Sequence, residues 1–240
     1  MNKPSISVTF FYHSCVAVES SEAYLLFDYF LKNPAIKIPF PGNKKFYILS
    51  SHGHHDHYSP DIFNDDFAPD PVSYVLSHDI KDTPSNKSIL RVEPYQAYTL
   101  DNLSIKTFGT TDIGVSFLVT MDGFQLFHSG DLNWWHWKHF SKEKQELEKN
   151  DFQSEIAKLP KDPIDLAFVP VDPRLEDASY LAAHYFINKL KPKYFVPIHL
   201  HTDFQVMKNF AKTVNPTHSQ ILTFEKTGET KHLSTVPYLK

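Results

Sequence analysis

The stretch Ser50-Ser51-His52-Gly53-His54-His55-Asp56-His57 follows an apolar run, residues 46–49, that predicts a short strand. Its pattern is His-x-His-x-Asp-His, which this histidine content would give by chance in roughly one of a few hundred such chains. Imidazoles two residues apart can converge on one cation, Asp56 and His57 can face a second, and Gly53 lets the backbone turn tightly. Imidazole and carboxylate suit zinc, manganese or iron better than calcium. A metal site is therefore predicted here, and a solvated histidine loop is the alternative.

The composition is typical of a soluble globular protein. The chain has 240 residues, of which 41% are hydrophobic and 22% charged, and no apolar run approaches the roughly 20 residues needed to span a bilayer. The N-terminus lacks the apolar stretch and cleavage site of a signal peptide. A single cysteine, Cys15, excludes an internal disulfide. These features predict a cytoplasmic protein without a membrane partner.

The charge balance bears on the kind of partner. The formal net charge is −4, and no segment of the sequence is strongly basic. A protein that binds nucleic acid normally needs a positive face to displace counterions, so nucleic acid is disfavoured and a small-molecule substrate is expected. The chain contains 14 histidines, an unusual number that metal binding or acid–base chemistry would explain.

The pattern of apolar residues predicts one layered α/β domain over residues 1–240. Strands are expected at 6–12, 24–27, 46–49, 72–76, 104–108, 115–120, 124–127, 164–169 and 194–198. Helices are expected at 142–159, 178–190 and 204–214, and a further helix start at Ser59-Pro60. Every candidate ligand group follows a predicted strand, which is where sheet-based enzymes usually place their chemistry.

Five short motifs, taken together, carry a family resemblance. In chain order they are Tyr12-His13-Ser14, Leu26-Phe27-Asp28, the loop from His52 to His57, Phe127-His128-Ser129-Gly130-Asp131, and Val196-Pro197-Ile198-His199. Over nearly its whole length the sequence resembles the metallo-β-lactamase-fold hydrolases, and it looks closest to the branch of ascorbate-phosphate-lactonase-like and related uncharacterised proteins. Tyr12 departs from that branch, which usually has glycine at this position.

The resemblance implies a four-layer αββα sandwich and a site for one or two divalent transition metals, with zinc first and manganese or iron as alternatives. It also implies that Asp131 bridges two metals and that Asp28 orients a ligand histidine from outside the metal shell. Asp56 would both bind metal and hold a metal-activated hydroxide in line with the bond to be cleaved. The expected ligands are His52, His54, Asp56, His57, Asp112, Asp131 and His199.

Asp112 is included because the chain departs from the family pattern. The family supplies a third histidine to the first metal between the second motif and the bridging aspartate, and residues 108–114 contain none. Asp112 is the nearest chemical substitute, and a carboxylate there would favour manganese or iron relative to zinc. The alternatives are that Asp112 is a turn residue beside a weak or empty site, or that His78 or His128 completes the site.

Substrate contacts are expected from two further segments. Trp134-Trp135-His136-Trp137 follows the bridging aspartate closely, so Trp135 or His136 can form a substrate wall, although packing within the domain explains such aromatics equally. Arg174 follows another predicted strand and can hold an anionic substrate group, with a surface salt bridge as the alternative.

The sequence therefore predicts a metal-dependent hydrolase of an ester, lactone, amide or phosphodiester bond. The absent third histidine makes a second hypothesis reasonable, a non-catalytic metal-binding or regulatory protein that retains the fold. A nuclease is a weaker third hypothesis, because the chain lacks a basic stripe and an inserted second domain.

Overall fold

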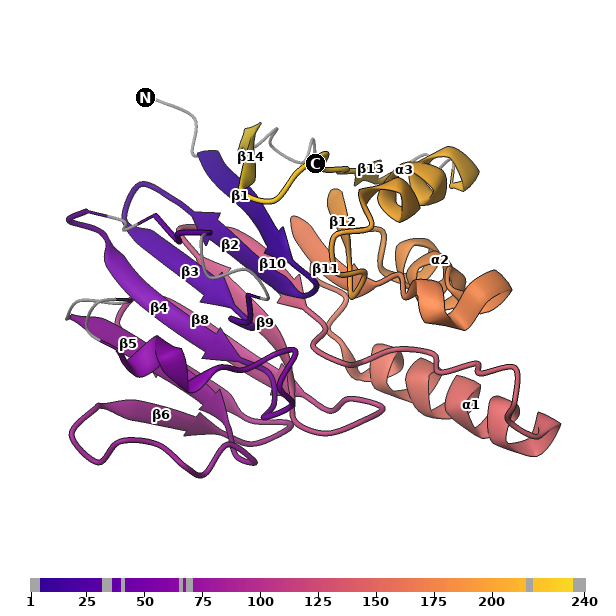
Figure 1. Cartoon of the computed structure of the whole chain (residues 1–240), viewed down its shortest axis with the longest axis horizontal. Helices are drawn as coiled ribbons and strands as arrows, with labels where there is room; N and C mark the ends of the chain where they lie inside the picture. Colours follow the sequence, from indigo (N-terminus) through magenta and orange to yellow (C-terminus); the bar gives the residue numbers. More distant parts are fainter. Residues whose placement is uncertain are drawn as a thin grey trace.

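The computed structural model describes residues 5–31, 36–39, 42–64, 67, 71–214 and 218–234. Two seven-stranded mixed β-sheets lie at its centre (Figure 1). The first sheet has the order β14 (Glu229–Ser234), β1 (Ser5–Tyr12), β2 (Cys15–Glu19), β3 (Ala23–Phe27), β4 (Lys45–Ser50), β5 (Val72–Ser77) and β6 (Ile89–Val92). The second has the order β13 (Gln220–Ile221), β12 (Tyr194–Ile198), β11 (Leu166–Pro170), β10 (Phe124–His128), β9 (Ser116–Met121), β8 (Leu103–Phe108) and β7 (Ala97–Leu100).

The two sheets bury their inner faces against each other. Phe10, Leu25 and Leu49 of the first sheet belong to the same buried cluster as Phe117 and Phe168 of the second. β3 and β11 are buried at every residue, as expected for strands covered on both faces. β8 instead alternates buried and more exposed residues, because only one of its faces meets the core.

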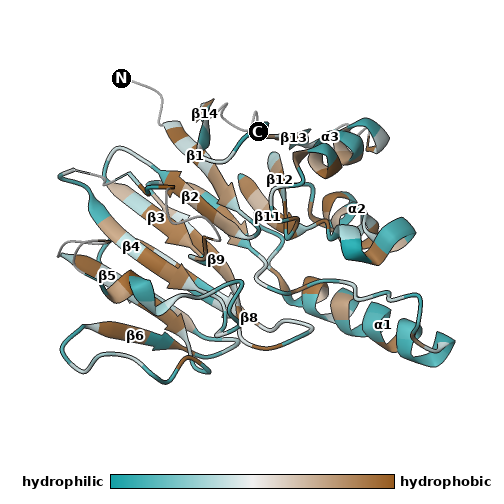
Figure 2. Cartoon of the chain, viewed as in Figure 1, coloured by the Kyte–Doolittle hydropathy of each residue, from teal (hydrophilic) through white to brown (hydrophobic). Residues whose placement is uncertain are grey.

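Helices cover the outer face of the second sheet. α1 (Lys142–Lys158), α2 (Leu181–Leu190) and α3 (Phe204–Thr213) contribute Phe152, Phe186 and Phe210 to a buried cluster with that sheet. In Figure 2 the strands are mostly apolar, whereas α1 turns polar residues outward. The outer face of the first sheet is covered, within the described ranges, by the 3₁₀ helix η1 (Pro60–Phe63), which buries Ile62, and by loops, one of which buries Ile38. The α/β sandwich predicted from the sequence is confirmed.

Some elements differ from the sequence prediction. β2, β6, β7, β13 and β14 were not predicted; β2 follows β1 through a turn at His13, whose left-handed backbone (φ 52°) is not signalled by glycine or asparagine. The helix start at Ser59-Pro60 gives one 3₁₀ turn, in which Ser59 caps Asp61. The predicted helix 178–190 begins later, at Leu181, and is preceded by the short 3₁₀ helix η2 (Pro173–Ala178), in which Glu176 has a left-handed backbone.

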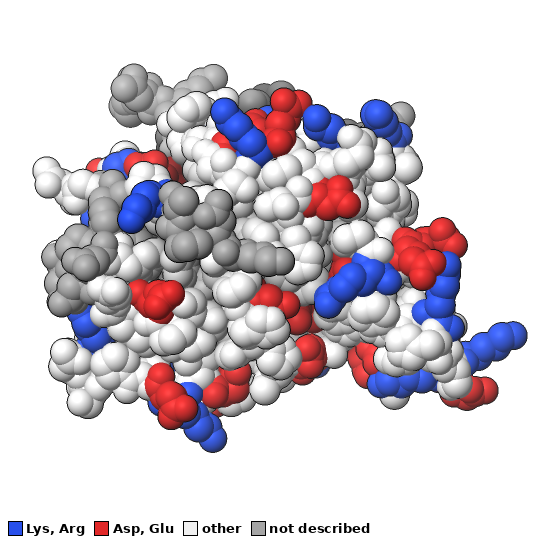
Figure 3. Space-filling view, viewed as in Figure 1, with Lys and Arg blue, Asp and Glu red and all other residues white. Residues whose placement is uncertain are grey.

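The sheet topology gathers the predicted site residues at one edge. β3 runs parallel to β4, and β10, β11 and β12 run parallel to one another, so the carboxyl ends of strands in each sheet lie together. No helix in the described part of the chain has the length and apolar character needed to cross a membrane. On the face shown in Figure 3, basic side chains are interspersed with acidic ones.

Candidate metal centre

Asp28 anchors both ends of the histidine-rich loop. It follows β3 in a left-handed backbone conformation (φ 45°) and is fully buried. Its Oδ1 accepts from the Ser51 backbone N–H, and its Oδ2 accepts from the Ser51 hydroxyl and from His57 Nδ1, each at 2.7 Å. Three accepted hydrogen bonds hold this carboxylate charged, and they fix the loop relative to the end of β3.

Two glycines let the second sheet approach this loop closely. A Cβ on Gly114 would lie 2.1 Å from the Ser51 carbonyl oxygen, and one on Gly130 would lie 2.7 Å from Ser51 Cβ. Both glycines have positive φ, and the Val115 N–H donates to the Ser51 carbonyl at 2.9 Å. Only glycine satisfies both the backbone angle and the close approach.

Asp131 lies between three histidines that come from both sheets. Its Oδ1 is 3.0 Å from His57 Nε2 and 3.2 Å from His199 Nε2, and its Oδ2 is 3.7 Å from His52 Nε2. All three Nε2 atoms and Asp131 Oδ1 are buried without a hydrogen-bond partner. Buried polar atoms are rarely left unsatisfied, and a cation shared among these atoms would satisfy them.

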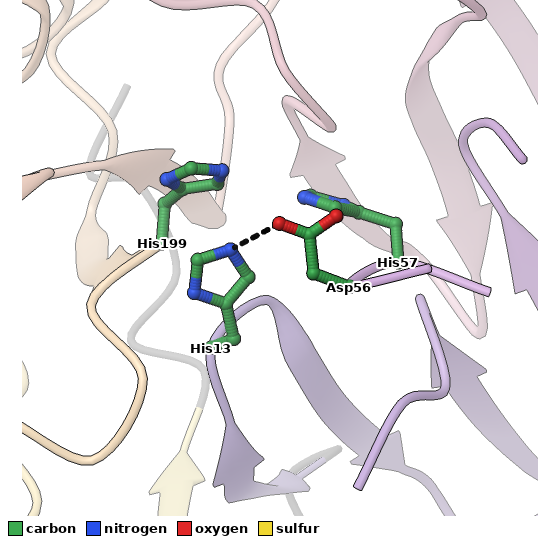
Figure 4. Close-up of side chains that lie close together, drawn as sticks. All are labelled: His13, Asp56, His57 and His199. Carbon is green, nitrogen blue, oxygen red and sulfur yellow. Dashed lines mark ion pairs between the residues drawn. The ribbon is translucent and has the colours of Figure 1, made fainter. Parts of the chain in front are cut away.

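The side chains form two groups, and within each group the ligand atoms lie within 4.8 Å of one another. One group comprises His52, His54 and Asp131. The other comprises His13, Asp56, His57 and His199, and Figure 4 shows these four side chains converging from three separate segments. Imidazole and carboxylate donors in this arrangement fit divalent transition metals.

Three of these histidines have their Nδ1 atoms occupied. His57 Nδ1 bonds to Asp28 at 2.7 Å, His199 Nδ1 lies 3.1 Å from Asp172 Oδ2, and His52 Nδ1 lies 3.0 Å from the Ser51 hydroxyl. The Ser51 hydroxyl donates to Asp28, so it accepts from His52. Each ring therefore holds a proton on Nδ1, and Nε2 is the nitrogen that faces the centre, as in metal-binding histidines.

Asp172 and His13 were missed as site residues by the sequence analysis. Asp172 follows β11 and was passed over in favour of Arg174 two residues later, although it follows a predicted strand as the other site residues do. The motif Tyr12-His13-Ser14 contributed to the family resemblance, but no role was assigned to His13. Burial and the neighbouring His199 lower the pKa of the His13 ring to about 3, so this ring is neutral at physiological pH.

Without a cation, the carboxylates of the centre favour the protonated rings of His57 and His199. Burial opposes charge on His57, but the carboxylates of Asp131 and Asp28 outweigh it and raise the pKa of His57 well above its usual value. Asp131 and Asp172 raise the pKa of His199 in the same way against burial. A cation that binds Nε2 must displace these protons.

Asp112 and the two alternative histidines lie differently from the main groups. Asp112 Oδ2 is 3.7 Å from His54 Nδ1, both side chains are about half exposed, and Asp112 belongs to neither ligand group. His128 accepts from the Gly130 N–H and points Nε2 at the Ser14 carbonyl, so both of its nitrogens are occupied. His78 faces Glu93 and lies outside both groups.

A cavity of about 520 Å³ opens over the two groups. Trp135 and Trp137 line it with parallel rings 6.0 Å apart, and Trp135 meets the His199 ring edge-on. Arg174 lines it too, with its guanidinium held by Asp172 and lying over the Trp137 ring. His136 is not among the lining residues.

Comparison with known proteins gives one family. Residues 7–199 match the family model described as "Beta-lactamase superfamily domain". No curated protein sequence matches the chain.

Several solved structures share the fold. Igni18, a metallo hydrolase from Ignicoccus hospitalis, is 19% identical, with a TM-score of 0.68 over 97% of this chain and 100% of the other. The metallo-β-lactamase fold protein YhfI from Bacillus subtilis is 15% identical, with a TM-score of 0.60 over 96% and 100%. The diiron β-hydroxylase CmlA from Streptomyces venezuelae is 9% identical, with a TM-score of 0.59 over 98% of this chain and 55% of that one.

Proposed function

Because the chain belongs to the β-lactamase superfamily, we propose that it is a hydrolase that depends on one or two divalent transition metals. Three buried Nε2 atoms without partners, arranged around the carboxylate of Asp131, are the observation that carries this proposal. The bond to be cleaved is an ester, lactone, amide or phosphodiester. Zinc suits ligand groups that are rich in imidazole. Manganese or iron would suit the group of His52, His54 and Asp131 if Asp112 were a further ligand there.

Each site residue has a distinct proposed role. His52 and His54 would hold one ion, His57 and His199 the other, and Asp131 would bridge both. Metals in this site would supply a Lewis acid and lower the pKa of a bound water toward neutrality. Asp28 and Asp172 keep the histidine protons on Nδ1. Asp56 lines the cavity and is half buried beside His57, where it can orient the attacking water and accept its proton.

The cavity supports a small-molecule substrate with an anionic group. Its volume of about 520 Å³ lies in the range of ordinary small-molecule sites. The two stacked tryptophans offer an apolar wall beside His199, and Arg174 lines the same space. We therefore propose Trp135, Trp137 and Arg174 as substrate contacts and omit His136.

A non-catalytic metal-binding protein is the second candidate. The observation that favours it is the open first group, where His54 is half exposed and no third histidine is present. Such a protein would bind metal without turning over any substrate.

Metal content and hydrolysis, measured on one preparation, test the proposal. The protein loaded with zinc, manganese or iron should hold one to two ions per chain and cleave some member of a panel of paired anionic and neutral esters, lactones, amides and phosphodiesters. Asp131→Ala should lose at least one ion and all activity. Asp177→Ala is the matched control, since this aspartate is exposed and its ion pair is with Lys138. Bound metal with no turnover would favour the second candidate, and unchanged metal content in Asp131→Ala would refute the site.

A further inference from the structure

We propose that His13 is a positioning residue, which donates a hydrogen bond from Nε2 to Asp56 and does not bind metal. The proposal deepens the metal-dependent function and rests on it, because Asp56 belongs to one of the ligand groups and is proposed to orient the attacking water. His13 lies among the ligand groups, with its ring centroid 4.0 Å from that of His199, so proximity alone would make it a ligand. The hydrogen bonds around its ring indicate otherwise.

Backbone contacts lock His13 to the segment that carries His199. The His13 N–H donates to the His201 carbonyl, and the His199 N–H donates to the His13 carbonyl, both at 2.9 Å. The His201 N–H also donates to His13 Nδ1 at 3.2 Å. All three histidines have left-handed backbones, with φ between 52° and 65°, a conformation that costs energy and is common at functional sites.

The bond from His201 decides the tautomer of His13. A backbone N–H can only donate, so Nδ1 of His13 must be the accepting nitrogen. A neutral imidazole carries one proton, which therefore sits on Nε2, and a protonated Nε2 cannot coordinate a cation. The arrangement is the reverse of that in His57 and His199, where Nδ1 faces a carboxylate.

Asp56 is the acceptor that this proton faces. His13 Nε2 lies 3.5 Å from Asp56 Oδ2, the pair joined by the dashed line in Figure 4. This separation exceeds that of a formed hydrogen bond, and Nε2 has no other partner; such bonds often tighten when a site is filled. The His13 side chain is 1% exposed, so water does not compete for its proton. His13 thus holds one oxygen of Asp56 and leaves the other for the cation or the attacking water.

Nitrogen NMR of ¹⁵N-histidine-labelled protein tests the tautomer directly. In both metal-free and zinc-loaded protein, His13 should show a protonated Nε2 and an unprotonated Nδ1. On zinc loading, Nε2 of His52, His57 and His199 should take on zinc-bound shifts while that of His13 does not. A zinc-bound Nε2 on His13 would overturn the proposal. If none of the histidines responded to zinc, the result would instead count against the proposed function. The tautomer in metal-free protein would still decide the role of His13.

Two substitutions test the donor. His13→Gln keeps an N–H donor near the same place. His13→Phe keeps an aromatic ring but has no N–H donor. We expect zinc affinity within about threefold of the wild type for glutamine and a loss of roughly 10–100-fold for phenylalanine. His232→Gln, on the exposed strand β14, is the control and should change nothing. Equal losses in both His13 variants, or no loss in either, would refute the role, and unfolding of the metal-free variants identifies a general loss of structure.

Discussion

Replacing Asp28 by asparagine should move the proton of His57 onto the nitrogen that faces the metal. Asp28 Oδ2 accepts from His57 Nδ1 and from the Ser51 hydroxyl. An amide nitrogen in that place is a donor, and although the hydroxyl can rotate to accept, the ring N–H cannot. Flipping the amide brings the same conflict to the Ser51 backbone N–H. His57 would then favour a proton on Nε2, where it competes with the cation.

The size of the effect follows from these contacts. One buried hydrogen bond to a charged group is lost, which is worth about 1.5–3 kcal/mol. In a domain of this size that corresponds to a fall of roughly 3–12 °C in the melting temperature of the metal-free protein. Loss of the partner that orients His57 should also weaken metal binding about 10–100-fold.

Zinc affinity, measured by competition with a chelator, and calorimetric unfolding of the metal-free protein check both effects. The matched control is Asp101→Asn, since Asp101 is about half exposed and accepts a hydrogen bond from the Tyr47 hydroxyl. It should leave zinc affinity unchanged and stability within about 0.5 kcal/mol. Wild-type zinc affinity in Asp28→Asn would show that this carboxylate does not set the tautomer of His57.

Two further predictions concern the approach of the sheets and the protons of the centre. Gly114→Ala should destabilise the protein by about 3 kcal/mol, because the new Cβ would clash with the Ser51 carbonyl and the backbone there is left-handed. Gly123 also has a left-handed backbone but lies in open space, so Gly123→Ala should cost only about 1 kcal/mol in the same thermal unfolding experiment. Equal losses would show that the contact with Ser51 is unimportant. Zinc binding should release protons, because His57 and His199 have raised pKa values and must lose protons to bind. Affinity should therefore fall as pH falls, and calorimetry in buffers of different ionisation enthalpy should give different heats; identical heats would contradict the proton exchange.

The sequence was most informative where the functional residues lie close together along the chain. The loop from His52 to His57 could be interpreted without a structure because its spacing carries chemical meaning, and the resemblance to the family's motifs assigned Asp131 and His199. β3 and β11 were visible as apolar runs because both of their faces are buried.

Other features depend on contacts that no local pattern reveals. The role of His13 is set by a backbone N–H from His201, which lies 188 residues away in the chain. Asp172 matters because β11 runs parallel to β12 and brings it to His199. His136 was expected to line the cavity with Trp135, but Trp137 lines it and His136 does not.

Anomalous X-ray diffraction from zinc-loaded crystals tests the central claim most directly. We expect peaks on the two sides of Asp131, one at bonding distance from His57 and His199 and the other from His52 and His54. Zinc that bound elsewhere, or a centre that stayed empty at saturating zinc while the fold was intact, would contradict the assignment.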